Sequence, residues 1–476
     1  MEYTNLYVDG AWREGSDGTR FDVINPWDES VLASVASASL EDANDALDAA
    51  HAAFADWAGR TPRERSVVLR RAWELMTERL EDFARLITLE NGKARADAIG
   101  EATYAAEFFR WFSEEAVRID GLISHAPASG ARIIVQHKPA GIAVLVTPWN
   151  YPAAMGTRKI APALAAGCPV IIKPASETPL TMLALMPLLE EAGVPKGVVN
   201  VLPSRNTGKM VDMMLHDPRV RVVSFTGSTE VGRKLLHSAA DQVLKPAMEL
   251  GGNAPLIVFE DADLDVAIEG TMLAKMRNLG EACTAANRIY VHDDIREAYI
   301  ERLSAAMSAL KVGDGLDPTV NVGPLVNAET RDKVADFVAD AIAKGAILHC
   351  GGTKPEGKGF AYPPTVLSNV PEHADCVRDE IFGPVAAIQG FTDQDEVVAR
   401  ANDTEYGLVA YVFTEDMRRG MRVCESLDYG MVGLNRGLVS DPAAPFGGTK
   451  QSGLGREGGH EGMHEFMESQ YISTSW

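Results

Sequence analysis

Residues 142–173 read "IAVLVTPWNYPAAMGTRKIAPALAAGCPVIIK", and this stretch decides the fold. It begins with a short apolar run rich in β-branched residues, 142–147, and it ends with another, 170–173. Between them an amphipathic stretch runs from Ala153 to Ala166 and stops at Gly167, and glycine is the residue that most often ends a helix. Strand, helix and strand in this order predict a parallel βαβ unit.

The same alternation continues toward the C-terminus. A helix is expected from Thr178-Pro179 to Gly193, and strands are expected at "VVNVL" (198–202) and "VRVVSFT" (220–226). Thr before Pro at the start and Gly at the end are typical helix boundaries. The pattern therefore predicts a doubly wound parallel sheet.

A second set of strand signals follows "ELGGNAP" (249–255). We expect a second α/β domain there, with the boundary near Gly251-Gly252. Before the first strand, apolar residues recur at helical spacing over two stretches, the second of which follows Thr61 and Pro62. The second set of strands is expected at 256–260, 288–291, 410–413 and 431–435, and the N-terminal helices at 40–57 and 62–89.

Bulk composition narrows the class of protein. The chain has 476 residues and a net charge of −22, which predicts several domains and argues against nucleic acid or an anionic membrane as partners. The five cysteines are dispersed without a C-x-x-C pair, so we interpret them as thiols in a reducing cytoplasm. The sequence shows no signal-peptide pattern and no apolar run of the ~18 residues that a membrane span requires.

Two motif matches are set aside. "HEGMH" (460–464) fits H-E-x-x-H, but glycines interrupt and precede it, and no third zinc ligand follows closely. "GLGREG" (453–458) fits G-x-G-x-x-G, but it does not follow a strand, as the dinucleotide fingerprint requires. No metal is expected at the first motif, and the second is interpreted as a glycine-rich turn.

Four stretches carry candidate chemistry. Cys283 lies in "MRNLGEACTAANR" (276–288), among small and polar neighbours that suit an accessible thiol better than a core cysteine. "TPWNYP" (147–152) ends a predicted parallel strand, and "FTGSTEVG" (225–232) leads from a strand into a helix whose N-terminus can face a pyrophosphate. Glu249 stands at the expected domain junction, where burial would favour general-base work.

In combination these stretches resemble the aldehyde dehydrogenase superfamily over essentially the whole chain. The matching motifs occur in the order that the family has, and within the family the sequence resembles the succinate-semialdehyde dehydrogenases most. The motifs are "INPWDES" (24–30), "TPWNYP", "KPASETP" (173–179), "FTGSTEVG", "ELGGNAP", the cysteine segment, "EIFGPV" (380–385), "ANDTEYGL" (401–408) and "PFGGTKQSGLGREGG" (445–459).

The resemblance implies a fold and a set of roles. Cys283, as thiolate, would attack an aldehyde carbon, Asn150 with the Cys283 backbone N–H would form the oxyanion hole, and Glu249 would activate the water that hydrolyses the thioester. The implied fold has a Rossmann-type cofactor domain (1–125 and 141–250), an α/β catalytic domain (251–445) and a small oligomerisation arm (126–140 and 446–476). A homodimer or homotetramer is implied.

The resemblance also implies a nicotinamide cofactor. Trp149 and Ser228 would lie near the pyrophosphate, Glu380 near the nicotinamide ribose, and Lys173 and Ser176 near the adenosine ribose. A cation and a neutral donor there accept a 2′-phosphate, so NADP is expected to be preferred, with NAD as the alternative. The full cofactor-binding set is Thr147, Pro148, Trp149, Lys173, Pro174, Ala175, Ser176, Gly227, Ser228, Leu250, Glu380 and Phe382.

The implied substrate is a small carboxylated aldehyde. Arg158, Arg277 and Ser440 match the residues that hold the distal carboxylate in succinate-semialdehyde dehydrogenases, and arginine pairs bidentately with carboxylate. Two departures, Glu281 two residues before the cysteine and Arg436 near Ser440, leave a preference for glutarate semialdehyde open. A phosphorylated aldehyde, a broad aliphatic aldehyde and a non-catalytic interaction protein are the further alternatives, although the last would not need to retain all three catalytic residues.

Overall fold

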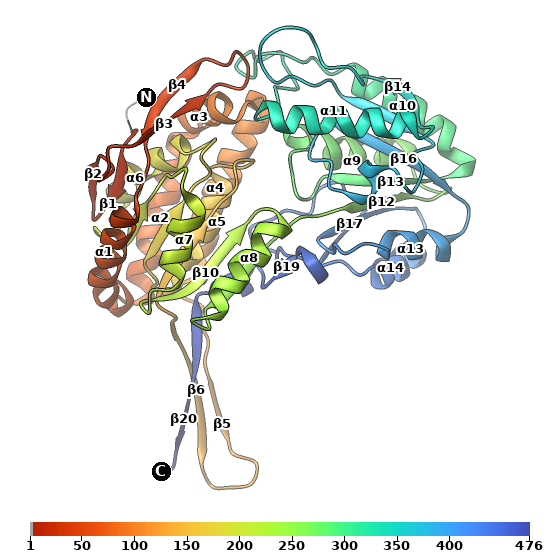
Figure 1. Ribbon diagram of the computed structural model, residues 1–476. Helices are drawn as coiled ribbons and strands as arrows, with labels where there is room; N and C mark the ends of the chain where they lie inside the picture. The colour runs from red at the N-terminus through yellow and green to blue at the C-terminus, as the bar shows by residue number, and fades with distance from the viewer. Residues whose placement is uncertain (1–2) are drawn as a thin grey trace.

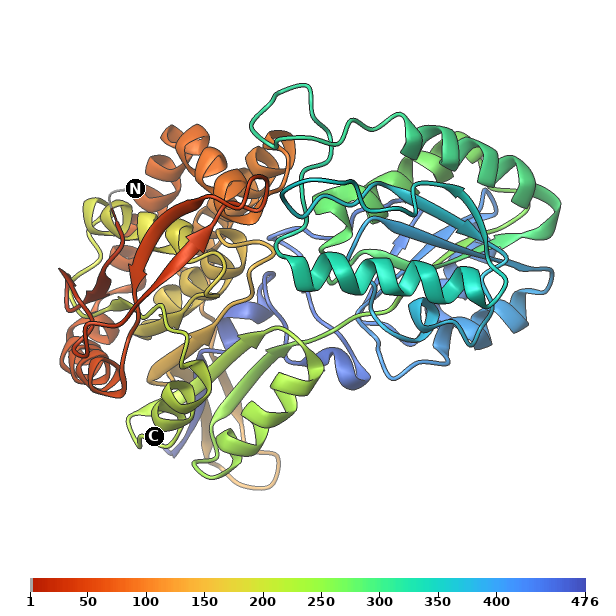
Figure 2. The ribbon, with the colours of Figure 1, turned by 45° about the horizontal axis from the view of Figure 1, so that its top comes forward.

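A computed structural model describes residues 3–476 of the chain. Within these residues the strands form an eight-stranded sheet, a seven-stranded sheet and two smaller ones. Figure 2 shows the two large sheets as neighbouring bodies, the first formed mostly by the N-terminal half of the chain and the second by the C-terminal half. The two α/β sheets that the sequence predicts are therefore confirmed.

The eight-stranded sheet has a parallel centre and antiparallel edges. Strands β9, β8, β7, β10 and β11 pair in parallel, whereas β1, β2 and β19 pair antiparallel at the two sides. In the order of the sheet, the strands are β19 (Gly453–Leu454), β11 (Lys245–Glu249), β10 (Val220–Thr226), β7 (Ile142–Val146), β8 (Val170–Lys173), β9 (Val199–Val201), β1 (Leu6–Val8) and β2 (Ala11–Arg13).

Both faces of this sheet are covered by helices, as its continuous apolar strands require, and successive side chains of a strand pack into opposite cores. Ala143 and Leu145 of β7 pack into the core beneath one group of helices, and Ile142, Val144 and Val146 pack into the core on the other side. The first group is α2 (Pro62–Glu78), α3 (Leu80–Asn91), α4 (Arg95–Glu115), α5 (Ala154–Ala166) and α6 (Leu180–Ala192), and the second is α1 (Leu40–Gly59), α7 (Thr207–Leu215) and α8 (Thr229–Ala240).

Two helix boundaries differ from the sequence prediction. The helix expected at 62–89 is split at Arg79, whose φ of −115° and ψ of 21° interrupt the α conformation. Helix α6 begins at Leu180 without a side-chain cap from Thr178-Pro179. Instead the buried carboxylate of Glu90 accepts the first backbone N–H groups, from Leu180 at 2.7 Å and Thr181 at 2.8 Å.

The seven-stranded sheet is parallel except at the edge strand β14. In order, its strands are β14 (Ile347–Cys350), β15 (Thr365–Ser368), β16 (Val385–Phe391), β13 (Ala286–His292), β12 (Ala254–Val258), β17 (Val409–Phe413) and β18 (Met431–Leu434). Helices α9 (Leu264–Met276), α10 (Asp293–Ser308) and α11 (Ala328–Ala343) share one of its cores, α13 (Gln394–Asn402) and α14 (Met417–Ser426) share the other, and α12 (Asp375–Arg378) is a short helix before β16.

The two sheets present opposite strand ends to the space between them. Asn150, Lys173 and Glu249 stand at or after the carboxyl ends of β7, β8 and β11, where parallel α/β sheets bind ligands. Cys283, in contrast, precedes the amino end of β13. Each sheet therefore supplies one side of a shared site.

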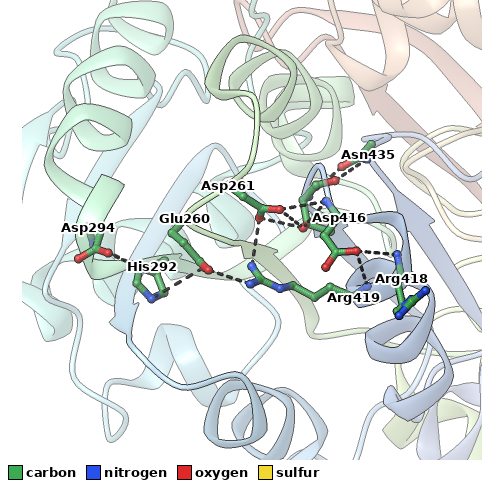
Figure 3. A network of polar contacts seen from close by, with 9 residues as sticks. Glu260, Asp261, His292, Asp294, Asp416, Arg418, Arg419 and Asn435 are labelled. Carbon is green, nitrogen blue, oxygen red and sulfur yellow. Dashed lines mark hydrogen bonds and ion pairs between the residues drawn. The ribbon is translucent and has the colours of Figure 1, made fainter.

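The carboxyl ends of the second sheet are tied together by ion pairs. Arg419 of α14 bridges Glu260 and Asp261, which follow β12, at 2.8 and 3.1 Å, and His292 at the end of β13 lies 3.9 Å from Glu260 (Figure 3). The side chain of Asn435, after β18, joins the same network through the backbone of Thr414. These strand ends thus fix helix α14.

A three-stranded antiparallel sheet extends from the body, with the C-terminus on it (Figure 1). It comprises β5 (Leu122–His125), β6 (Arg132–Pro139) and β20 (Met467–Thr474). The expected arm segment 446–476 is only partly in this sheet, because β19 pairs with β11 in the eight-stranded sheet. The remaining elements are the pair β3 (Arg20–Ile24) and β4 (Val31–Ala36), the short helix α15 (Glu461–His464) and two 3-10 helices, η1 (Arg277–Gly280) and η2 (Lys450–Ser452).

Candidate active site

Most of the residues expected at the site line one cavity of about 240 Å³. The cavity lies where the carboxyl ends of the first sheet meet the amino ends of the second. Its lining includes Pro148, Trp149, Asn150, Arg158, Gly227, Ser228, Leu250, Arg277, Cys283, Glu380, Phe382 and Ser440. Outside the lining are Thr147, Lys173, Pro174, Ala175, Ser176 and Glu249.

A left-handed turn carries Cys283 into the cavity. Asn278 and Leu279 have φ of +53° and +57°, a conformation that costs a non-glycine residue about 1–2 kcal/mol. The Asn278 side chain compensates, because its amide donates to the carbonyl oxygens of Asn150 and Glu281, both at 2.9 Å. The thiol of Cys283 is half-buried at the end of this turn.

Opposing influences act on the pKa of the Cys283 thiol. Burial and the Glu380 carboxylate raise its pKa to about 12, and the guanidinium groups of Arg158 and Arg277 oppose them. The thiolate that the resemblance implies would therefore need a base to take up the proton.

Asn150 is held through its backbone, which leaves its side chain for the cavity. Its carbonyl accepts from Lys93 Nζ at 2.7 Å and from Asn278, while its own Nδ2 donates to the Glu281 carbonyl at 3.0 Å. Lys93 is in turn paired with Glu101 at 2.5 Å, with both side chains fully buried. A primary amide has two N–H groups, so one remains for a ligand.

Glu249 is a buried carboxyl with an unpaired oxygen. The residue is 3% exposed, and no described residue forms a hydrogen bond with its Oε2 atom. Burial first, and then the charge of Glu457, raise its pKa well above the usual range, while Arg158 and Lys159 act in the opposite sense. A carboxyl with a raised pKa and a free oxygen has the properties of a general base.

Two guanidinium groups and a hydroxyl line the same cavity. Arg158 is 2% exposed, and its Nη2 atom is buried without a hydrogen-bond partner among residues 3–476. Arg277 lies 5.5 Å from the ring centre of Tyr151 and forms no ion pair or hydrogen bond with any described residue. With Ser440, these unpaired donors suit an anionic group.

The two departures from the family pattern lie outside the cavity lining. Glu281 is fully buried and accepts a hydrogen bond from the backbone N–H of Val326 at 3.1 Å, and burial raises its pKa to about 8. Arg436 is exposed. Neither side chain therefore adds a charge to the lining.

The structure offers groups that fit a dinucleotide. Lys173 is 6% exposed, burial lowers its pKa to about 8, and its ammonium forms no ion pair or hydrogen bond within residues 3–476. Ser228 caps the N-terminus of helix α8, whose first N–H groups are suited to phosphate. Glu380 accepts the N–H of Gly252 at 3.2 Å. The buried unpaired ammonium is the observation that favours an anionic or polyhydroxylated ligand.

The residues of "HEGMH" (460–464) form contacts with one another. The Nε2 atoms of His460 and His464 are 3.0 Å apart, and His460 pairs with Glu115 at 2.9 Å. Within the described chain, no group of three or more His, Cys, Asp and Glu side chains is arranged to hold a metal ion. Helix α15 is four residues long, too short to present the motif on a helical face.

Several residues around the site were missed by the sequence analysis. Glu457 lies inside the glycine-rich match that was set aside, and it forms ion pairs with Arg158 and Lys159. Lys93 and Glu101 fix the Asn150 loop from far away in the sequence, since Lys93 bonds to Asn150 across 57 positions and Glu101 to Ala153 across 52. No local pattern in the sequence marks these residues.

The chain belongs to the aldehyde dehydrogenase family, whose sequence model matches residues 12–472. A succinate-semialdehyde dehydrogenase of Paenarthrobacter nicotinovorans is 52% identical over 94% of this chain and 99% of that protein. A glutarate-semialdehyde dehydrogenase of Pseudomonas aeruginosa is 46% identical over 98% and 96%. Among solved structures, an NADP-dependent enzyme of E. coli is 46% identical, with a TM-score of 0.98 over 99% of this chain and 98% of that one.

Two further findings concern the chain as a whole. All five cysteines are free thiols. Among the helices of residues 3–476, none combines the length and the apolar character that crossing a bilayer demands.

Proposed function

We propose that this aldehyde dehydrogenase oxidises succinate semialdehyde to succinate. The observation that carries the proposal is that Cys283, Arg158, Arg277 and Ser440 line one cavity. A thiol is the nucleophile that an aldehyde carbon needs, and the unpaired Arg277 guanidinium with the free Nη2 of Arg158 provides for a carboxylate on the same molecule. The name of the P. nicotinovorans relative supports the same substrate.

The first step is addition to the carbonyl. As Cys283 Sγ bonds to the aldehyde carbon, the thiol proton leaves to a base, and the carbonyl oxygen becomes an oxyanion. The free N–H of the Asn150 amide and the Cys283 backbone N–H would donate to that oxyanion. The thiol proton passes to solvent water, and Glu249, whose Oε2 is unpaired, stays available for the later hydrolysis step.

The oxidation of the adduct to a thioester on Cys283 requires a hydride acceptor, and a bound nicotinamide dinucleotide would supply that chemistry. Trp149, Ser228, Glu380 and Phe382 would hold the cofactor from the cavity side. Glu249 then removes a proton from water, the resulting hydroxide attacks the thioester carbon, and the C–S bond breaks with the Cys283 thiolate as leaving group. The acid product leaves as its carboxylate.

For the cofactor, we propose a preference for NADP. Lys173 offers an unpaired buried cation at the end of β8, and Ser176 offers a hydroxyl donor, both of which favour a 2′-phosphate. The E. coli structure is that of an NADP-dependent enzyme. The carboxylate of Glu177, which accepts from Ser176 Oγ at 3.2 Å, opposes the preference and leaves room for NAD.

Glutarate semialdehyde is the second candidate substrate. The P. aeruginosa relative that bears this name supports it, and one more methylene changes binding by only about 1–3 kcal/mol. A broad aliphatic aldehyde would leave the guanidinium groups of Arg158 and Arg277 without a function. A non-catalytic role would not require Cys283, Asn150 and Glu249.

For assembly, we propose a homodimer or homotetramer in which the arm docks on a second copy. The three-stranded sheet carries exposed apolar side chains, with Ile123 72% and Tyr471 60% exposed. Apolar side chains that gather on an exposed surface mark sites of association. In the same proposal, residues 1–125 and 141–250 bind the cofactor and 251–445 carry the nucleophile. The free thiols suit a cytoplasmic location.

Initial rates of NADPH and NADH formation across a panel of aldehydes test the proposal. The panel pairs succinate and glutarate semialdehydes with uncharged aldehydes of equal chain length. We expect kcat/KM to be at least about 100-fold higher for the carboxylated member of each pair, as a paired buried charge would give. Equal values within a pair would remove the role of the two arginines.

A further inference from the structure

The Arg158 guanidinium has one edge engaged and one edge free. Its Nε atom lies 2.7 Å from Glu457 Oε2 in an ion pair. On the other side, Nη2 has no hydrogen-bond partner in the described chain, and the contact of Nη1 is with the sulfur of Met155 at 3.7 Å. The guanidinium carbon lies 4.0 Å from the ring centre of Phe446. The group is thus a planar bridge between Glu457 and the cavity.

Glu457 binds a second cation next to the first. Its Oε1 atom lies 2.5 Å from Lys159 Nζ, and Lys159 Nζ also donates to Ser224 Oγ at 2.9 Å. Glu457 is 5% exposed and Lys159 is 1% exposed. In such a dry cluster, a change in the charge around one member is felt by the others, because solvent screens little there.

Glu249 packs against the segment that carries Glu457. The backbones of Phe446 and Glu457 exchange hydrogen bonds of 2.7 and 2.8 Å. At the next residue, Gly447, an added Cβ would lie only 2.9 Å from Glu249 Oε1. The carboxyl of the candidate base therefore lies beside the backbone that positions Glu457.

Charged and titratable groups face Glu249 from each element packed against it. Helix α5 contributes Arg158 and Lys159, and the segment after β19 contributes Arg456 and Glu457. The thiol of Cys283 faces it from the cavity side. After burial, Glu457 is the strongest influence that raises the pKa of Glu249, and Arg158 is the strongest that lowers it.

We propose that Arg158 couples substrate recognition to the general base: a substrate carboxylate bound on the free edge of its guanidinium neutralises part of the charge that otherwise acts on Glu457 and Glu249. The proposal rests on the proposed function, because it requires a carboxylated substrate at Arg158. Glu457 is then a positioning residue, which holds the guanidinium between the two sites.

The sign of the coupling follows from the charges. A carboxylate on Arg158 adds a negative charge to a cluster that already holds Glu457 and Glu249, so the pKa of Glu249 rises further. Glu249 must be ionised to take a proton from water, so the rate of thioester hydrolysis decreases as the pH is lowered through the pKa of Glu249. When the acyl group carries a carboxylate, this decrease, the acid limb of the pH profile, should begin at a higher pH. We expect a displacement of about one pH unit, the size typical of a nearby charge.

The wild-type enzyme provides the first test. Thioester hydrolysis is measured against pH after a rapid burst of reduced cofactor, once with succinate semialdehyde and once with butanal, its uncharged counterpart. The apparent pKa of the acid limb should be higher by about one unit with succinate semialdehyde. Acid limbs that coincide, or that are displaced in the opposite direction, overturn the coupling.

Two matched variants separate coupling from simple binding. Arg158→Met and Arg277→Met each remove one guanidinium from the cavity, but only Arg158 is paired with Glu457. With butanal, which has no carboxylate to bind, Arg158→Met should still displace the acid limb upward, while Arg277→Met should leave its position unchanged. A role of Arg158 in binding alone predicts no displacement with butanal in either variant. Thermal melts establish that both variants fold, and the comparison of substrates on the wild type stands without them.

The outcomes also distinguish this proposal from the proposed function. If carboxylated aldehydes show no advantage in kcat/KM, the proposed function fails. If they show the advantage but their acid limb coincides with that of butanal, the function stands and the coupling is wrong.

Discussion

Replacing Asn150 by alanine isolates the oxyanion hole, because the structure separates the side chain from the support of the loop. The supporting hydrogen bonds from Lys93 and Asn278 go to the Asn150 carbonyl, which alanine keeps. The side chain itself makes one hydrogen bond, to the Glu281 carbonyl at 3.0 Å, and that carbonyl retains the amide of Asn278 at 2.9 Å. The cost in folding free energy is thus about 1 kcal/mol.

The cost in catalysis should be larger. Loss of one donor to an oxyanion lowers the rate by about 10²–10³-fold, or about 2.7–4 kcal/mol in the barrier. Because the donor acts on charge that develops in the transition state, kcat should fall while KM changes little. Stopped-flow measurement of the first turnover of reduced cofactor reports the step directly.

Asn200→Ala is the matched control. Asn200 is a fully buried asparagine whose side chain bonds to Gly197 O at 2.8 Å and to Asp9 N at 3.0 Å, outside the cavity. The Asn200→Ala variant should be less stable than the wild type and should keep the wild-type rate of the first turnover. If Asn150→Ala folds normally and its first turnover is within about fivefold of the wild type, the oxyanion role of Asn150 is refuted.

Three further substitutions test the surrounding chemistry. Glu249→Gln should give one burst of reduced cofactor, about one equivalent per site, and then stall as a thioester; continued turnover at the wild-type rate in quench-flow would exclude Glu249 as the base. Glu177→Gln removes the carboxylate that accepts from Ser176, so the NADP-to-NAD ratio of kcat/KM should rise about fivefold, and an unchanged ratio would count against a 2′-phosphate near Ser176. Glu281 has a pKa raised to about 8 by burial, so the folded state keeps a proton that the unfolded state releases, and stability is lost as the pH rises from the unfolded value of 4.5 toward 8. Glu281→Gln should therefore raise the melting temperature at alkaline pH, with a gain that shrinks toward pH 5 (about the unfolded pKa); a gain independent of pH would contradict the reasoning.

Several elements could be predicted from local patterns alone. The strands expected at 170–173 and 220–226 coincide with β8 and β10, because buried parallel strands are continuous apolar runs between turn residues. The predicted end of helix α5 at Gly167 agrees with the structure, because Gly167 adopts a φ of +99°, which glycine tolerates. The break at Arg79 has no local signal, since neither proline nor glycine marks it. Strands β1–β4 were missed because they pair antiparallel, outside the alternation of strand and helix on which the prediction was based.

The residues that line the cavity could be predicted from sequence motifs, but the buried charged residues that hold them in place could not. The cavity gathers residues of the quoted motifs because each motif ends or begins a strand of one of the two sheets. Glu457 is 298 residues from Lys159, and its partners become visible only when the glycine-rich segment 447–459 folds back onto α5. Charges of this kind obtain their function from packing, and no spacing in the sequence encodes them.

Covalent capture of the acyl intermediate tests most directly whether Cys283 attacks the aldehyde. The Glu249→Gln enzyme is mixed with succinate semialdehyde and NADP, quenched in acid and digested. Mass spectrometry should find the peptide that contains Cys283 heavier by about 100 Da, the mass that a succinyl thioester adds. A reduced-cofactor burst with an unmodified Cys283 peptide, or with the added mass on another cysteine, would contradict the account.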